Sequence, residues 1–228
     1  MIIIDLFGLP GTGKSTIAKE LYIEFKKREI DVYFFNKNEY LKDEKFEKRR
    51  LFDYIKLLKV KNIIFFIQFV LIKKEKDIFR QGMKEKIWKK LRLVMLYDKL
   101  TQKSDENKIC IVDQGIIQDF SDYYININVK HEFVRKYLNC FLKSNNKYIY
   151  VYCDLEVENA IDRIKNRNRK LYNFDLLKEQ ELKIFLEKEY EKFKIFEDCL
   201  KDNENYLKIY SSNELVLENI KRIIEKCS

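Results

Sequence analysis

The chain has 228 residues, which is enough for one domain with a substantial hydrophobic core. Its 46 lysines and arginines outnumber 37 aspartates and glutamates, so the net charge is +9. Most lysines alternate with acidic residues along helical patterns, as on a solvated helix face. The composition therefore argues against a disordered chain and against a dedicated nucleic-acid-binding surface.

The five cysteines contain no C-x-x-C pair, and two of them, Cys110 and Cys153, fall inside predicted strands. This pattern favours buried thiols in a reduced, cytoplasmic protein over a zinc site or a disulfide scaffold. The single histidine, His131, lies among charged residues in a helical pattern, so we expect a surface or boundary histidine rather than a catalytic one. The N-terminal apolar run is too short to be a secretory signal.

The most informative stretch comes first, at residues 1–19. An apolar run, Ile2–Phe7, predicts a buried strand, and a helix is predicted from Ser15 to about Arg28. Between them lies the pattern G-x-x-x-x-G-K-S, in which glycines let backbone N–H groups turn inward around a phosphate. We therefore predict a nucleotide-binding loop and helix start made of Gly8, Gly11, Thr12, Gly13, Lys14, Ser15 and Thr16.

Two residues of this loop have predicted chemical roles. The Lys14 ammonium is expected to neutralise the β- and γ-phosphates of a bound nucleotide, and the Ser15 hydroxyl is expected to bind Mg²⁺.

A second strand is predicted at Ile30–Phe35, followed by polar residues at its carboxyl end. The long region from about 41 to 102 has helical periodicity and is far longer than an ordinary crossover, so we expect it to contain a substrate-side insertion. Its most apolar part, Ile63–Ile72, is too short to span a bilayer. We favour a buried helix there over an interfacial membrane contact.

A third strand is predicted at Lys108–Val112, and it ends on Asp113. An acid at this position suits the organisation of a magnesium ion, although a simple turn aspartate before Gly115 is the alternative. A fourth strand, Lys147–Cys153, leads into Asp154, which we expect to cap the next helix.

The helix predicted after Asp154 carries arginines that are spaced either to clamp phosphates during transfer or to complement the helix dipole. The candidates are Arg163, Arg167 and Arg169.

The remaining pattern predicts a helix at 120–142, an amphipathic helix from Phe174 to about Leu200, a fifth strand at Tyr206–Tyr210 and a closing helix at 214–227. Strands that alternate with helices, with the phosphate loop after the first strand, predict an open parallel sheet in a three-layer α/β/α domain. The active crevice is expected at the carboxyl ends of strands one to four.

At three places the sequence resembles the P-loop kinases of small molecules, in particular the thymidylate kinase and deoxynucleoside kinase group. GLPGTGKST is similar to that group's phosphate loop, and IVDQG stands where the group has a strand-ending D-R or E-R pair. Tyr150–Lys170 is similar in register to its strand, acidic helix start and arginine-bearing lid, with Ala160, Arg163 and Ile164 at matching positions.

The resemblance implies a P-loop NTPase fold over residues 1–228, with a five-stranded parallel sheet, a helical insertion between strands two and three and a lid at about 163–175. It implies transfer of the γ-phosphate of ATP to a small-molecule acceptor such as a nucleoside, nucleotide or sugar, with ATP and Mg²⁺ as cofactors. The residues it makes catalytic are Lys14, Asp113, Arg163, Arg167 and Arg169.

The sequence also departs from that group. Gln114 stands where the group has an acceptor-binding arginine, and Asn38-Glu39-Tyr40 replaces its E-P motif after the second strand. Glu39 is a candidate general base, with an exposed loop glutamate as the alternative. Asp5, in the middle of the first strand, has no counterpart in the group and no assigned role.

The leading alternative function is a nucleotide-dependent ATPase or switch that acts on a protein or membrane partner, and binding of RNA or DNA by the lysine-rich surface is a third. The arginines separate the kinase from the switch, because a kinase supplies its own charge-stabilising arginines whereas a switch often receives one from a partner. The sequence leaves monomer and homodimer both open.

Overall fold

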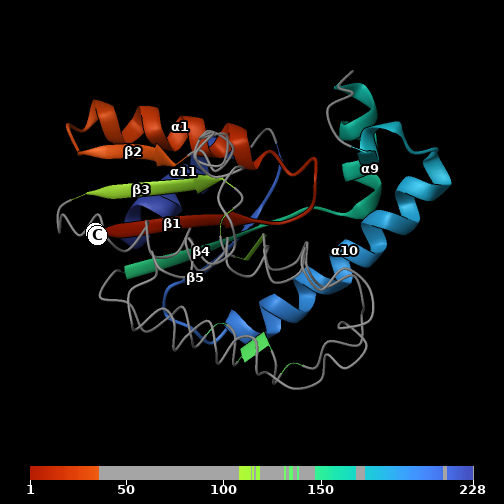
Figure 1. Cartoon of the computed structure of the whole chain (residues 1–228). Helices are drawn as coiled ribbons and strands as arrows, with labels where there is room; N and C mark the ends of the chain where they lie inside the picture. The colour runs from red at the N-terminus through yellow and green to blue at the C-terminus, as the bar shows by residue number, and fades with distance from the viewer. Residues whose placement is uncertain are drawn as a thin grey trace, which may run out of the picture.

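The computed structural model describes residues 1–35, 108–113, 115, 117–118, 131, 134–135, 138, 147–167, 173–212 and 215–227. Five strands in these ranges form one all-parallel sheet in the order β2-β3-β1-β4-β5 (Figure 1). The strands are β1 Ile2–Phe7, β2 Val32–Phe35, β3 Ile109–Asp113, β4 Lys147–Asp154 and β5 Tyr206–Tyr210. The predicted five-stranded parallel sheet is therefore confirmed.

Helices cover both faces of this sheet. They are α1 Lys14–Lys27, α9 Val157–Asn166, the short 3-10 helix η1 Asn173–Leu176, α10 Glu179–Leu200 and α11 Val216–Cys227. Helices α1 and α11 pack against one face and α10 packs against the other, while α9 lies beyond the carboxyl ends of the strands (Figure 1). This is the three-layer α/β/α arrangement that the sequence predicted.

The central strand β1 shows how the apolar pattern builds the two halves of the core. Ile4 and Leu6 belong to the cluster that α1 and α11 cover, whereas Ile3 and Phe7 belong to the cluster on the α10 side. All four side chains are fully buried, as expected for a parallel strand covered on both faces. Asp5 is also buried in this strand.

The order of the strands positions the site. Strand β1 pairs with β3 on one side and with β4 on the other, so the chain leaves β1 toward one half of the sheet and later builds the opposite half. Ligands of open α/β sheets bind at such a switch point, outside the carboxyl ends of the strands. The loop after β1 lies at this point.

Several predicted boundaries shift by one or two residues. Strand β2 begins at Val32 rather than Ile30, because Glu29 takes a left-handed conformation with φ of 57° and the Ile30 N–H still bonds to the carbonyl of Phe25 at 3.0 Å. Strand β3 continues through Asp113, which pairs with Leu6 of β1. The acid is therefore the last residue of the strand.

The single helix predicted from Phe174 to Leu200 is in fact two elements. Residues 173–176 form η1, and α10 starts only at Glu179, after Lys178 takes an extended conformation. The Glu181 carboxylate accepts a 3.1 Å hydrogen bond from the Lys178 N–H, which closes the helix start. Apolar periodicity runs across this break, which explains the error in the prediction.

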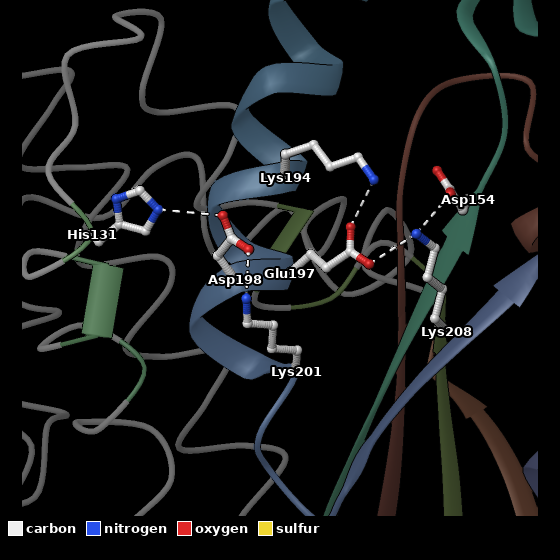
Figure 2. Close-up of polar contacts among 7 residues, drawn as sticks. All are labelled: His131, Asp154, Lys194, Glu197, Asp198, Lys201 and Lys208. Atoms are coloured by element: carbon white, nitrogen blue, oxygen red, sulfur yellow. Dashed lines mark hydrogen bonds and ion pairs between the residues drawn. The ribbon is translucent and has the colours of Figure 1, made fainter.

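A charged network joins α10 to the two neighbouring strands of the sheet. Lys208 of β5 lies between two carboxylates, 2.9 Å from Asp154 of β4 and 2.9 Å from Glu197 of α10, and Lys194 also pairs with Glu197 (Figure 2). The prediction that Asp154 caps α9 is wrong, because Glu156 is the residue at the N-cap and Asp154 instead pairs with Lys208.

Several predictions fall on residues outside the described ranges, namely the insertion at 41–102, its apolar part at 63–72, and most of the helix at 120–142. Among the helices that the structure describes, none has the length and apolar character needed to cross a membrane. His131 is exposed and lies 3.5 Å from Asp198, so the expectation of a surface histidine is confirmed (Figure 2).

Candidate active site

The loop between β1 and α1 depends on glycine conformations. Gly8, Gly11 and Gly13 have φ angles of 143°, 88° and 79°, in the region that side chains other than glycine rarely adopt. Gly13 is the N-cap of α1, and its carbonyl accepts the N–H groups of Thr16 and Ile17. The positive end of the α1 dipole therefore points into the loop, as an anion-binding site requires.

The Lys14 side chain is buried inside this loop. Its ammonium donates hydrogen bonds to the carbonyl oxygens of Gly8 at 2.8 Å and Leu9 at 2.7 Å, and to the Thr12 hydroxyl at 3.2 Å. Thr12 in turn donates to the Leu9 carbonyl at 2.9 Å. These bonds hold the Lys14 ammonium where the loop curves.

Two of the glycines are also required by close packing. A Cβ atom on Gly8 would lie 2.4 Å from the carbonyl oxygen of Cys153 in β4. A Cβ atom on Gly11 would lie 3.1 Å from the carbonyl of Ala160 and 3.4 Å from Ile164, both in α9. The loop is thus pressed between the end of β4 and the flank of α9, which fixes its shape.

Asp113 and Ser15 meet beside the loop. The Ser15 hydroxyl donates a 2.5 Å hydrogen bond to Oδ2 of Asp113, across a sequence separation of 98 residues. The other carboxylate oxygen, Oδ1, is buried and has no hydrogen-bond donor among the described residues. A hydroxyl and a strand-ending carboxylate with spare acceptor capacity are the oxygen ligands that Mg²⁺ prefers, so these residues fit that ion.

Gln118 is a site residue that the sequence analysis missed. Its side-chain oxygen accepts a 3.2 Å hydrogen bond from the Gly8 N–H, which ties the segment after β3 to the first residue of the loop. The contact spans 110 residues, so no local pattern could reveal it. The only available signal was the position of Gln118 five residues beyond the strand-ending acid.

Asp5 explains why a glycine follows Asp113. The carboxylate of Asp5 lies so close to Gly115 that a Cβ atom there would stand 2.3 Å from Oδ1 and 2.7 Å from Oδ2. A side chain at position 115 would therefore require the Asp5 carboxylate to shift. The buried acid thus lies directly against Gly115.

Of the three candidate lid arginines, Arg163 contacts the phosphate loop itself. One guanidinium nitrogen donates to the Gly11 carbonyl at 3.4 Å, and the other donates to the carbonyl of Ser211, just after β5, at 2.7 Å. Arg163 therefore joins the loop, α9 and the end of β5. The sequence pattern indicated a basic residue here but not its two carbonyl acceptors.

Arg167 follows one helical turn later, at the C-cap of α9. It forms an ion pair with Asp175 in η1, and the Asp175 side chain is fully buried. Arg169, Gln114 and Glu39 lie outside the described residues.

The buried thiol nearest the loop is not suited to nucleophilic chemistry. Burial raises the pKa of Cys153 to about 12, and this effect outweighs the opposing influence of the Lys14 charge. The thiol therefore stays protonated near neutral pH. Cys110 and Cys153 are both buried in strands, as the sequence predicted.

The parallel sheet, with its G-x-x-x-x-G-K-S turn between the central strand and α1, gives the chain a P-loop nucleotide-binding fold of the kinase-like kind. Strand order, the strand-ending acid and the helix α9 against the loop all agree with this class.

Solved structures of one kinase are similar to the chain over nearly its whole length. The structure of deoxyadenosine kinase from M. mycoides with dCMP and dCDP bound has a TM-score of 0.51 and 18% identity, covering 99% of this chain and 98% of that one. The structure of the same enzyme with dCTP bound has a TM-score of 0.50 and 18% identity, and the match covers 98% of each chain. The structure with dATP bound has a TM-score of 0.50 and 20% identity, covering 99% of this chain and 98% of that one. At such identities the likeness shows the fold.

Part of the chain also matches a family model. Residues 1–63 match the family described as chromatin associated protein KTI12. The matched part contains β1, the phosphate loop, α1 and β2, which is the nucleotide-binding start of the fold. No curated protein matches the chain significantly.

Proposed function

We propose that the protein is a Mg²⁺- and ATP-dependent phosphotransferase that moves the γ-phosphate of ATP to a small-molecule acceptor. The observation that carries the proposal is the contact between the Ser15 hydroxyl and Asp113 beside the loop that surrounds Lys14. Phosphoryl transfer needs positioned positive charge more than covalent chemistry, and this arrangement supplies it.

Each residue of the site would have a definite task. Lys14 would exchange its carbonyl contacts for oxygens of the β- and γ-phosphates, while the α1 amino terminus and the loop N–H groups bind the same phosphates. Ser15 and Asp113 would hold Mg²⁺, with Asp113 acting directly or through a bound water. Bound Mg²⁺ supplies charge neutralisation on the phosphates.

The arginines favour a kinase over a nucleotide-dependent switch. Arg163 and Arg167 both come from α9, and Arg163 already contacts the phosphate loop. A chain that carries such groups itself does not need a partner to supply the stabilising positive charge. The binding of a partner that triggers hydrolysis is the alternative, and the experiment below separates the two.

Nucleosides and nucleotides are the first acceptors to test. The similar solved structures are of a deoxyadenosine kinase with dCMP, dCDP, dCTP or dATP bound, and their fold agrees with this chain over nearly all of its length. Sugars and related hydroxyl compounds form the second part of the panel, because Gln114 and Asn38-Glu39-Tyr40 replace the acceptor-binding residues of the deoxynucleoside kinase group.

The test is ADP release by the purified protein with Mg²⁺ and ATP against this panel. We expect one class of acceptor to accelerate ADP release, and we expect Lys14→Ala to abolish the acceleration because the phosphates lose their central cation. Lys19→Ala is the matched control, since Lys19 lies on the exposed face of the same helix.

Two results would count against the proposal. Acceleration that persists in Lys14→Ala would show that this loop is not the catalytic site. Tight ATP binding without any acceptor-dependent ADP release would favour the nucleotide-dependent switch, and a protein or membrane partner would then be the next search.

A further inference from the structure

The end of α9 and the following 3-10 helix are joined by a buried ion pair. A nitrogen of the Arg167 guanidinium, Nη2, donates to Oδ1 of Asp175, eight residues further along the chain. The Asp175 side chain has no exposed surface, and that of Arg167 is 24% exposed. The carboxylate is thus held wholly inside the protein, while the guanidinium reaches its surface.

Aromatic packing fixes the guanidinium further. Arg167 lies over the ring of Phe174 at 5.4 Å, and Phe174 stacks on Phe185 of α10 with ring centroids 5.9 Å apart and planes inclined by 10°. The cation is therefore held from its edge by Asp175 and from its face by Phe174. Both contacts connect it to the elements that precede and begin α10.

This pairing leaves part of the guanidinium for another ligand. Among the described residues, the second terminal nitrogen of Arg167, Nη1, has no protein acceptor and is the group left for a ligand, whereas Nε is buried. Guanidinium groups bind phosphates through several N–H groups at once, so a cation held at one edge by a carboxylate can still bind an anion elsewhere.

The residues near Arg167 on α9 indicate which kind of anion it would bind. Arg163, four residues earlier and on the same helix face, donates to the carbonyl of Gly11 in the phosphate loop. Ile164, between them, packs against the same glycine position. Arg167 therefore lies one helical turn beyond the residues of α9 that contact the phosphate loop.

Breaking the Arg167–Asp175 ion pair when a nucleotide binds would be unfavourable. Moving Arg167 away would take an ion pair and a charge-assisted hydrogen bond from a carboxylate that has no exposed surface, which is unfavourable. An exchange of Arg167 from Asp175 to a phosphate is therefore disfavoured, and retention of both contacts is favoured. A cation already held in place also gives up less side-chain entropy when it binds.

We propose that Asp175 is a positioning residue that holds Arg167 so that its remaining N–H groups bind the outer phosphate of a nucleoside triphosphate. This inference rests on the proposed function, because it takes the loop to bind ATP. It adds a residue that no motif of the sequence indicated.

The test compares the affinities for ATP and ADP, each with Mg²⁺, by titration calorimetry. The ratio of the two affinities reports the contacts made to the outer phosphate, and transfer to an acceptor is not needed to measure it. We expect Arg167→Gln to lower the preference for ATP by about tenfold, as for the loss of one charge-assisted contact. We expect Asp175→Asn to lower it similarly, and the double variant to lower it no further.

Glu179→Gln is the matched control. Glu179 pairs with Lys165, so this variant also removes an ion pair between α9 and the start of α10, but both side chains are largely exposed. The preference for ATP should be unchanged. If Asp175→Asn does not fold, Arg167→Lys decides: an ammonium can pair with Asp175 but lacks the second planar N–H group, so the preference must fall.

Three results would overturn the inference. One is an unchanged preference for ATP in Asp175→Asn, or in Arg167→Lys. Another is losses in the two single variants that add up in the double variant. The third is an equal affinity of the unmodified chain for ATP and ADP. A chain that prefers ATP but phosphorylates no acceptor would contradict the proposed function, while the affinity ratio would still decide the role of Asp175.

Discussion

At the level of single residues, Ser15 allows a direct test of the magnesium site. Its hydroxyl is exposed and bonds to Asp113 at 2.5 Å, so Ser15→Ala removes one oxygen ligand while the carboxylate remains. We expect Mg²⁺ to increase the affinity for ATP about tenfold less in Ser15→Ala than in the unmodified chain. Nucleotide titrations with and without Mg²⁺ measure this difference.

Ser15→Thr is the control for this experiment, because threonine keeps the hydroxyl at the same position. Its response to Mg²⁺ should equal that of the unmodified chain. If Ser15→Ala kept the full response, the ion would have to bind without this hydroxyl.

Gly115 provides a second test at this scale. A methyl group there would overlap the Asp5 carboxylate, with all three terminal atoms of that side chain within 2.7 Å. We expect Gly115→Ala to lower the free energy of unfolding by about 1–3 kcal/mol, which urea denaturation would measure. In an Asp5→Ala background the same substitution should cost less. Equal costs in the two backgrounds would rule out the clash as the cause.

At the level of elements, the packing of α9 against the phosphate loop can be isolated by two alanine substitutions. Gly11 and Gly13 have similar φ angles, 88° and 79°, so alanine is strained at both. Only at position 11 would the new methyl group also meet α9, 3.1 Å from the Ala160 carbonyl, whereas nothing lies within 4 Å at position 13. We expect Gly11→Ala to be the more destabilising by about 1 kcal/mol.

Thermal or urea unfolding of the two variants without nucleotide measures that difference. Equal destabilisation would mean that α9 moves away from the loop at no cost. In that case the position of Arg163 and Arg167 would not depend on contact between α9 and the loop.

How far local patterns predict an element depends on where its contacts come from. The ends of β1 and β5 were predicted to the residue, because apolar runs bounded by turn residues determine them. The break between η1 and α10 was missed, because it depends on the extended conformation of Lys178 rather than on a change of periodicity. Asp154 was misassigned as a cap because its partner, Lys208, is distant in sequence.

The residues of the candidate site also differ in how far local sequence patterns predict them. The phosphate loop was predictable because its chemistry needs one spacing of glycine, lysine and serine in consecutive residues. The partnership of Ser15 with Asp113 followed from the rule that strand ends meet at one edge of a parallel sheet. Gln118 and Asp175 were not predicted, because they act on other side chains or on the backbone through contacts that no motif encodes.

At the level of the whole molecule, the network around Lys208 makes stability depend on pH. The Glu197 carboxyl is subject to burial, which raises its pKa, but hydrogen bonds and charges from Lys194 and Lys208 outweigh burial and bring the pKa below 4.5. Because its pKa is lowered on folding, the Glu197 carboxyl stabilises the folded protein above pH 4.5. This stabilisation is lost as the pH falls through the lowered pKa.

Lys208 itself does not titrate in this range. Burial acts to lower its pKa, but the bonds and charges of Glu197 and Asp154 outweigh that effect and raise it above 10.5. The contribution of Lys208 is therefore fully present below 10.5 and is lost only as the pH rises through the raised value. The stability that the Lys208–Glu197 pair loses as the pH falls from 7 therefore comes from the Glu197 carboxyl.

We expect Lys208→Met to lower the free energy of unfolding by about 2 kcal/mol at pH 7, because two largely buried carboxylates lose their shared cation. The loss should shrink as the pH falls through the lowered pKa of Glu197, because a protonated carboxyl no longer pairs with the cation. Lys221→Met is the control, since the Lys221–Glu225 pair is exposed and should contribute little. A loss independent of pH would mean that Lys208 acts through packing rather than charge.

The strand order also determines when the nucleotide site can form during synthesis. Strand β1, which carries the phosphate loop, has its partners at Ile109–Asp113 and Lys147–Asp154, and β2 lies beyond β3 rather than beside β1. The described part of the first 63 residues, 1–35, therefore contains two strands that are not neighbours in the sheet and do not pair with each other. We therefore expect the native neighbours of the loop-bearing strand to be complete only after residue 154 has been synthesised.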